Sequence, residues 1–133
     1  MFLDTTFCID LMRERHRRMD GPATRKLSAL GQGPLYVSFF VLCELNAGAR
    51  LAERPEEEIR KVQRFSELVE VVLPDRTFPV AYGEAEAVLR RQGMPVPTMD
   101  LLIGVTAKAH GLPILTRDSL HFARIPGLVV ESY

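Results

Sequence analysis

The amino-acid sequence predicts one α/β domain with a small, mostly parallel central sheet. Helical patterns alternate along the chain with four or five short apolar runs, and this alternation is typical of parallel strands joined by helices. The chain has 133 residues, of which 47% are hydrophobic and 26% are charged. This composition allows one sizeable core and excludes a disordered chain. Because no internal repeat or low-complexity linker divides the sequence, we expect residues 1–133 to form a single domain.

Each predicted strand is a short apolar run that is followed by polar residues, a helix start or a proline. The runs cover residues 1–3, 35–38, 71–73, 114–116 and 128–130. The predicted helices cover residues 5–12 with an extension into the basic segment that follows, 23–30, 39–51, 55–68, 78–91 and 98–110. Asp4, Ser38 and Thr98 are favourable N-caps, Pro55 suits the first position of a helix, and Gly93 ends one.

Charge and cysteine content restrict the possible classes of protein. Seventeen basic residues balance seventeen acidic residues, so the net charge does not indicate a nucleic-acid binder. Six Lys and Arg residues gather between Arg13 and Lys26, and they could form either a phosphate-attracting surface or an ordinary solvated helix end. Cys8 and Cys43 lack a CxxC spacing and are expected to be buried, reduced thiols. Without a leader segment or a membrane-length apolar run, we expect a cytoplasmic protein that does not enter a membrane.

Four carboxylates occupy positions where strands end or helices begin. Asp4 follows the first strand, Asp118 follows the fourth, Asp100 lies in the first turn of a helix, and Glu44 interrupts an apolar helix after the second strand. Functional residues gather at the carboxyl ends of parallel strands, so we expect these side chains to converge. Such a cluster would repel itself without a cation, and oxygen ligands favour Mg²⁺ or Mn²⁺. Taken singly, Asp4 could be only an N-cap, Asp118 a turn residue and Asp100 a helix stabiliser.

A carboxylate-bound metal ion commonly acts on phosphoryl groups, so a phosphodiester is the expected class of substrate. The sequence has no GxxxxGK[ST] motif, which argues against hydrolysis of nucleoside triphosphates. A phospho-acceptor receiver module would need paired acids after the first strand and a lysine after a later strand, and both are missing. A haloacid-dehalogenase-type phosphatase would need a second aspartate two residues after Asp4, where Thr6 stands.

Four sequence blocks span nearly the whole chain: LDTTFCIDLMR, VSFFVLCELNAGA, PVPTMDLLIGVTAKAHG and ILTRDSLHFARIPGL. In this order they resemble the PIN-domain ribonucleases, and more narrowly the VapC toxins of bacterial and archaeal toxin–antitoxin pairs. The resemblance implies a PIN-like three-layer α/β/α fold and Mg²⁺- or Mn²⁺-dependent endonuclease action on RNA. It also implies inhibition by a small VapB-type antitoxin and assembly into homodimers. The alternative is a catalytically silent PIN-like module that binds RNA or its antitoxin.

The resemblance also implies roles for particular residues. The acids that would bind metal and orient the attacking water are Asp4, Glu44, Asp100 and Asp118. Thr6 stands where the family frequently has Asn or Ser, and its hydroxyl is expected to keep the site oriented, while Thr116 would support the cluster. Many relatives have an acid where this chain has His121, so whether Asp118 or His121 completes the site is open. RNA phosphates are expected to contact Arg13, Arg17, Arg18 and Arg117.

Overall fold

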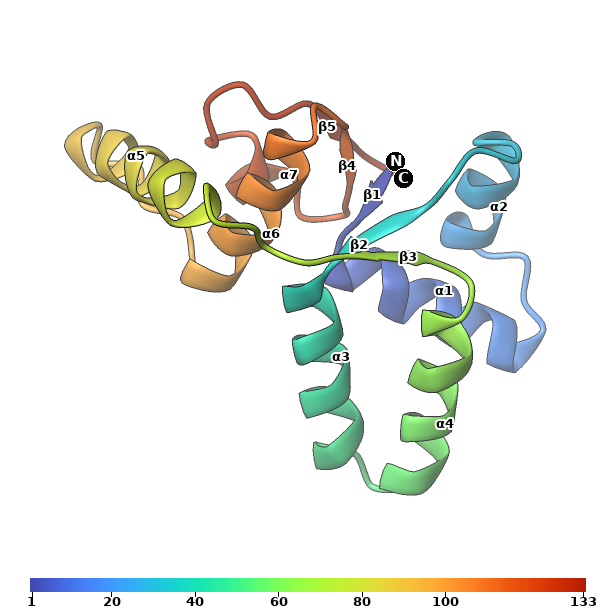
Figure 1. The fold of residues 1–133 in the computed structure, drawn as a ribbon. Helices are drawn as coiled ribbons and strands as arrows, with labels where there is room; N and C mark the ends of the chain where they lie inside the picture. Colours follow the sequence, from blue (N-terminus) through green and yellow to red (C-terminus); the bar gives the residue numbers. More distant parts are fainter.

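A parallel sheet of five strands, in the order β3-β2-β1-β4-β5, forms the centre of the molecule (Figure 1). A computed structural model describes all 133 residues of the chain. The strands are β1 Phe2–Leu3, β2 Tyr36–Ser38, β3 Glu70–Val72, β4 Ile114–Leu115 and β5 Val130–Glu131. In the centre, Phe2 of β1 pairs with Tyr36 of β2 on one side, and Leu3 pairs with Leu115 of β4 on the other. Strands β2 and β3 lie on one side of β1, and strands β4 and β5 lie on the other. A topological switch point therefore lies between β1 and β4, where ligands bind in sheets of this kind.

Seven helices connect the strands and flank the sheet (Figure 1). They are α1 Thr5–Arg17, α2 Pro22–Ala29, α3 Phe39–Leu51, α4 Pro55–Ser66, α5 Phe78–Arg91, α6 Thr98–Ala109 and α7 Ser119–Phe122. Helices α3 and α4 pack side by side and project together from the sheet, whereas α5 packs on α6 and α6 contacts α7. None of these helices has both the length and the apolar character needed to cross a membrane.

The core is a single cluster of buried apolar side chains centred on β1 and β4. Both residues of each of these two strands have no exposed surface, as expected for parallel strands covered by helices. Helix α6 approaches its neighbours closely because it carries Gly104. A Cβ atom at this position would lie 2.3 Å from Cδ1 of Ile125 and 3.2 Å from Cδ1 of Phe122. This close contact fixes the segment after β4, including α7, against α6.

The predicted strands and helices are confirmed, and their ends differ from the structure by at most two residues. The first predicted helix, for which no end residue was predicted, ends at Arg17. The short helix α7 forms where a turn was predicted. Two local predictions are wrong. Thr98 is the first residue of α6 and not its cap, because Pro97 takes the N-cap position. Cys43 is exposed, since it lies away from the buried face of α3 that carries Val41 and Leu45, whereas Cys8 is buried as predicted.

Candidate metal centre at the carboxyl edge of the sheet

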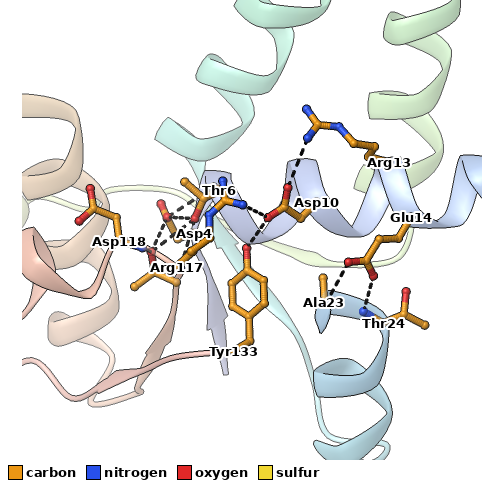
Figure 2. A network of polar contacts seen from close by, with 11 residues as sticks. Asp4, Thr6, Asp10, Arg13, Glu14, Ala23, Thr24, Arg117, Asp118 and Tyr133 are labelled. Carbon is orange, nitrogen blue, oxygen red and sulfur yellow. Dashed lines mark hydrogen bonds and ion pairs between the residues drawn. The ribbon is translucent and has the colours of Figure 1, made fainter. Parts of the chain in front are cut away.

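Asp4 is a buried carboxylate held by hydroxyl groups at the switch point. It follows β1, caps α1, and has only 3% of its surface exposed. Its Oδ2 accepts hydrogen bonds from Thr6 Oγ1 at 2.7 Å and from Thr116 Oγ1 at 2.8 Å (Figure 2). The backbone N–H of Thr6 adds a longer contact of 3.4 Å to the same oxygen. Because all these donors meet Oδ2, the other oxygen of Asp4 keeps its lone pairs for a further partner. Thr6 and Thr116 therefore both contact Asp4, and their supporting role in the site stays a prediction.

Glu44 reaches the same edge of the sheet from α3. Ser38 ends β2 and caps α3 by accepting a hydrogen bond from the backbone N–H of Val41 at 3.2 Å. This cap fixes the start of the helix, and Glu44 lies six residues further on. The hydroxyl of Thr5, in the first turn of α1, donates to Glu44 Oε2 at 2.5 Å. A carboxylate among apolar neighbours is thus oriented towards the residues that follow β1.

Asp100, Asp118 and His121 lie close enough together to act as ligands of one metal ion. One ligand atom from each lies within 4.8 Å of the other two. His121 Nδ1 is 3.1 Å from Asp100 Oδ2 and 2.9 Å from Asp118 Oδ2. The backbone N–H of Asp118 donates to Thr116 Oγ1 at 2.9 Å, so the same threonine contacts Asp4 and the loop that carries Asp118. The sequence left open whether Asp118 or His121 belongs to the site, and the structure places both beside Asp100.

The charges of these groups act together on Asp100. Burial is the largest effect that raises the pKa of Asp100. The carboxylate of Asp4 raises this pKa further, and Asp118 and Glu44 make smaller contributions in the same direction. Only His121 acts in the opposite direction and lowers this pKa. The other three predicted acids therefore all lie close enough to Asp100 to raise its pKa, and no Lys or Arg acts on Asp100 in the opposite direction. The arrangement fits a divalent cation, because such an ion would replace the missing positive charge.

A second polar network lies beside Asp4 and was not predicted from the sequence (Figure 2). Asp10 on α1 accepts a hydrogen bond from the hydroxyl of Tyr133 at 2.9 Å and pairs with Nη1 of Arg117 at 2.9 Å and of Arg13 at 3.7 Å. Burial and the nearby Asp10 carboxylate raise the pKa of Tyr133. The backbone N–H of Arg117 donates to Thr6 Oγ1 at 3.4 Å, so this network adjoins the acid cluster. The spacing of Asp10 and Arg13 on one helix was the only sequence signal for it.

The predicted RNA-binding arginines divide into two groups. Arg13, Arg17 and Arg117 line one hollow of about 230 Å³, together with Asp10 and Tyr133. Arg18 does not line it, because α1 ends there with Arg18 in the left-handed conformation, at a φ of 53°. Three of the four arginines are therefore brought together, and one is not.

A larger groove of about 410 Å³ runs between α1, α3 and α4. Its apolar lining includes Ile9, Leu45 and Val62, and its charged lining includes Lys61. Glu44 also lines this groove, so the groove reaches the acid cluster.

Comparisons with known proteins agree with this fold. The PIN domain family model matches residues 1–128. The chain is 32% identical over 132 residues to the tRNA(fMet)-specific endonuclease VapC of Shigella flexneri, covering 98% of this chain and 96% of the relative. It is 31% identical over 126 residues to Ribonuclease VapC1 of Haemophilus influenzae strain R2866, covering 95% and 92% of the two chains.

Solved structures show the same similarity. The structure of DNA-bound VapBC from Salmonella typhimurium matches with a TM-score of 0.87 and 30% identity, over 98% of this chain and 96% of the other. VapBC2 from Rickettsia felis, bound to a DNA fragment from its promoter, matches with a TM-score of 0.88 and 26% identity, over 99% and 97%. The chain therefore belongs to the PIN-domain family. Its relatives at 30% identity or more place it among the VapC proteins of that family.

Proposed function

We propose that this chain is a metal-dependent endoribonuclease and the toxin of a VapBC-type toxin–antitoxin pair. The observation that carries the proposal is the convergence of Asp4, Glu44, Asp100 and Asp118 at the switch point of a PIN domain. Relatives that match nearly the whole chain are named as VapC ribonucleases and endonucleases, which supports RNA as the substrate. Two of them are named as specific for tRNA(fMet), so initiator tRNA is the first substrate to test.

The metal ion proposed for this site is Mg²⁺ or Mn²⁺. Asp100 and Asp118 would hold it, and Asp4 and Glu44 would complete the acidic site. When bound, such an ion neutralises charge on a phosphate and lowers the pKa of a coordinated water. The threonines supply preorganisation, because they fix the carboxylates of Asp4 and Glu44 before a substrate arrives.

The hollow lined by Arg13, Arg17 and Arg117 is the proposed path of the RNA backbone next to the acids. Asp10 pairs with two of these guanidinium groups and holds them side by side, while leaving other N–H donors free for phosphate oxygens. Contacts of this kind position RNA without reading its sequence. Replacing Arg17 with Gln should therefore weaken binding of several RNAs alike and leave metal affinity unchanged. Arg18→Gln is the matched control and should have a smaller effect, because Arg18 lies outside the hollow.

Cleavage of purified RNA by the purified protein tests the enzymatic activity. Cleavage should require added Mg²⁺ or Mn²⁺, stop with EDTA, and be lost in Asp4→Asn. Glu84→Gln, which changes an exposed acid on α5, should cleave like the wild type. If the wild type binds RNA but cleaves no RNA with either metal ion, the chain is instead a silent PIN-like binding module.

The proposed protein partner is a VapB-type antitoxin, and the proposed assembly is a homodimer. The antitoxin is supported by solved relatives that are VapBC complexes. The groove between α1, α3 and α4 offers an apolar lining for a peptide segment, and occupation of its Glu44 end would obstruct the acid cluster. Expression of the chain alone should arrest bacterial growth, and coexpression of the neighbouring antitoxin gene should restore it. A Gly48→Arg change in the groove lining should prevent this rescue while leaving RNA cleavage intact, and unchanged rescue would exclude this groove.

A further inference from the structure

We propose that His121 is a direct metal ligand through Nδ1, so that the site is a mixed nitrogen and oxygen site which favours Mn²⁺ over Mg²⁺. This inference rests on the proposed metal site and goes beyond the set of carboxylates. Three observations carry it: the spacing of the ligand atoms, the lack of another partner for Nδ1, and the rigid placement of α7.

The spacing of the three ligand atoms matches neighbouring corners of an octahedral site. In an octahedron with bonds of about 2.1 Å, adjacent ligand atoms lie about 3.0 Å apart. His121 Nδ1 lies 3.1 Å from Asp100 Oδ2 and 2.9 Å from Asp118 Oδ2. The imidazole nitrogen thus stands where it could share one cation with both carboxylates.

Nδ1 of His121 has no other satisfactory partner. The atom is buried, although 31% of the side chain is exposed. Both carboxylate oxygens are near, but neither accepts a hydrogen bond from Nδ1 in an acceptable direction. A buried polar atom without a hydrogen bond is unfavourable, and a bond to a cation would satisfy it. Nδ1 of His121 thus lies beside two carboxylates without a hydrogen bond to either. This arrangement favours Nδ1 as a metal ligand over a simple ion pair of His121 with the two acids.

The core holds His121 in this place. Asp118 caps α7, and His121 follows three residues later on the same short helix. The next residue, Phe122, is 1% exposed and lies next to Gly104 of α6, the helix that also carries Asp100. The packing of α7 on α6 therefore determines the distance between His121 and Asp100. Such support by packing is what a ligand set needs in order to remain in position.

The identity of the ligand atom determines which ion is preferred. Mg²⁺ strongly prefers oxygen ligands and retains its water molecules, whereas imidazole nitrogen is a better ligand for transition-metal ions. One nitrogen among carboxylates should therefore increase the affinity for Mn²⁺ more than the affinity for Mg²⁺. A chain with an acid in place of His121 should discriminate less between the two ions.

Pulsed EPR of Mn²⁺ bound to the full-length protein tests this directly, because a coordinated ¹⁴N nucleus gives a hyperfine signal. The wild type should show this signal, and His121→Phe should lose it and bind Mn²⁺ at least about tenfold more weakly by calorimetry. His121→Asp should still bind Mn²⁺ without the nitrogen signal and with a smaller ratio of Mn²⁺ to Mg²⁺ affinity. His16→Gln is the control, since it removes an exposed histidine on α1, and should behave like the wild type.

The outcomes separate this inference from the proposed activity. If Mn²⁺ supports RNA cleavage but the wild type gives no ¹⁴N signal and His121→Phe binds Mn²⁺ normally, His121 is only an ion-pairing residue and the inference is wrong. A ¹⁴N signal that disappears in His121→Phe supports the inference even if no RNA is cleaved. Because the Asp variant provides the same comparison, misfolding of the Phe variant would leave the test intact.

Discussion

Replacing Thr116 with Val is the sharpest test of how the acid cluster is held together. The Thr116 side chain has no exposed surface, and its hydroxyl donates to Asp4 Oδ2 at 2.8 Å while accepting from the backbone N–H of Asp118 at 2.9 Å. Valine has nearly the same shape, so the change removes the hydroxyl without opening a large cavity. The variant should therefore report on the hydrogen bonds rather than on packing.

The expected loss follows from the charge of the acceptor. A hydrogen bond to an ionised group contributes about 1.5–3 kcal/mol, and a buried carboxylate that loses a donor has no water to replace it. Asp118 is half-buried and its N–H donates to an uncharged hydroxyl, so we expect the loss of this bond to add little. We expect Thr116→Val to lower the free energy of unfolding by about 2–3 kcal/mol at pH 7.

Urea denaturation in the presence of EDTA measures this difference, and Thr106→Val provides the matched control. Thr106 is also buried, at 2% exposure, but its hydroxyl donates only to the carbonyl of Leu102 within α6. Such a bond within a helix is nearly neutral, so the control should change stability by less than about 1 kcal/mol. Equal losses in the two variants would refute the idea that Thr116 stabilises the charge of Asp4.

Four further substitutions have predicted signs. The raised pKa of Asp100 means that its charge destabilises the fold as the pH rises above about 4, so Asp100→Asn in EDTA should be more stable than the wild type at pH 7 but not at pH 3. Burial acts to raise the pKa of Glu14, but hydrogen bonds from Thr24 and Ala23 outweigh it and lower this pKa. Glu14→Gln should therefore lose about 0.5–1 kcal/mol above pH 5, and the loss should shrink as the pH falls below about 4. Gly104→Ala should lose about 1 kcal/mol in thermal unfolding because its Cβ meets Ile125, whereas Gly83→Ala, with open space around it, should gain up to about 1 kcal/mol.

The long elements of the fold could be predicted because their signals are local. Helix α4 begins with Pro55 and three glutamates and shows an apolar face at helical spacing, and these features depend on no distant residue. The alternation of helices and strands predicted a parallel sheet, but not the strand order β3-β2-β1-β4-β5, because alternation does not determine which strands are neighbours. The four-residue helix α7 could not be predicted, because so short a segment has no periodicity, and it forms by packing Phe122 against α6.

The candidate site could be predicted as a set of residues but not as a geometry. Sequence position identified all four acids, with Asp4 and Asp118 at strand ends and Glu44 and Asp100 in helices, and the resemblance gave them roles. The distances then depend on packing between segments that lie far apart in the chain. Whether Asp118 or His121 completes the site was open from the sequence, and both lie within reach of Asp100.

The second network, around Asp10, shows a related limit. Tyr133 reaches Asp10 from the other end of the chain, and nothing local to either residue indicates the contact. The ring of Tyr133 also stacks edge-on against Phe7 of α1, with the ring centroids 4.8 Å apart. Tyr133 and Asp10 line the hollow together with Arg13, Arg17 and Arg117. A contact between distant parts of the chain, and not a sequence motif, therefore helps to form this hollow.

The acid cluster is proposed to bind a divalent cation in order to cleave RNA. RNA cleavage by wild type and Asp100→Asn across a Mn²⁺ titration tests it most directly, with circular dichroism to confirm that both are folded. Cleavage by the wild type should rise from zero with Mn²⁺ and disappear in EDTA. Asp100→Asn should remain folded and cleave at least about a hundredfold more slowly at every concentration, as expected when a metal ligand is lost. Cleavage that persists in EDTA, or that proceeds normally in Asp100→Asn, would show that the acid cluster does not act through a metal ion.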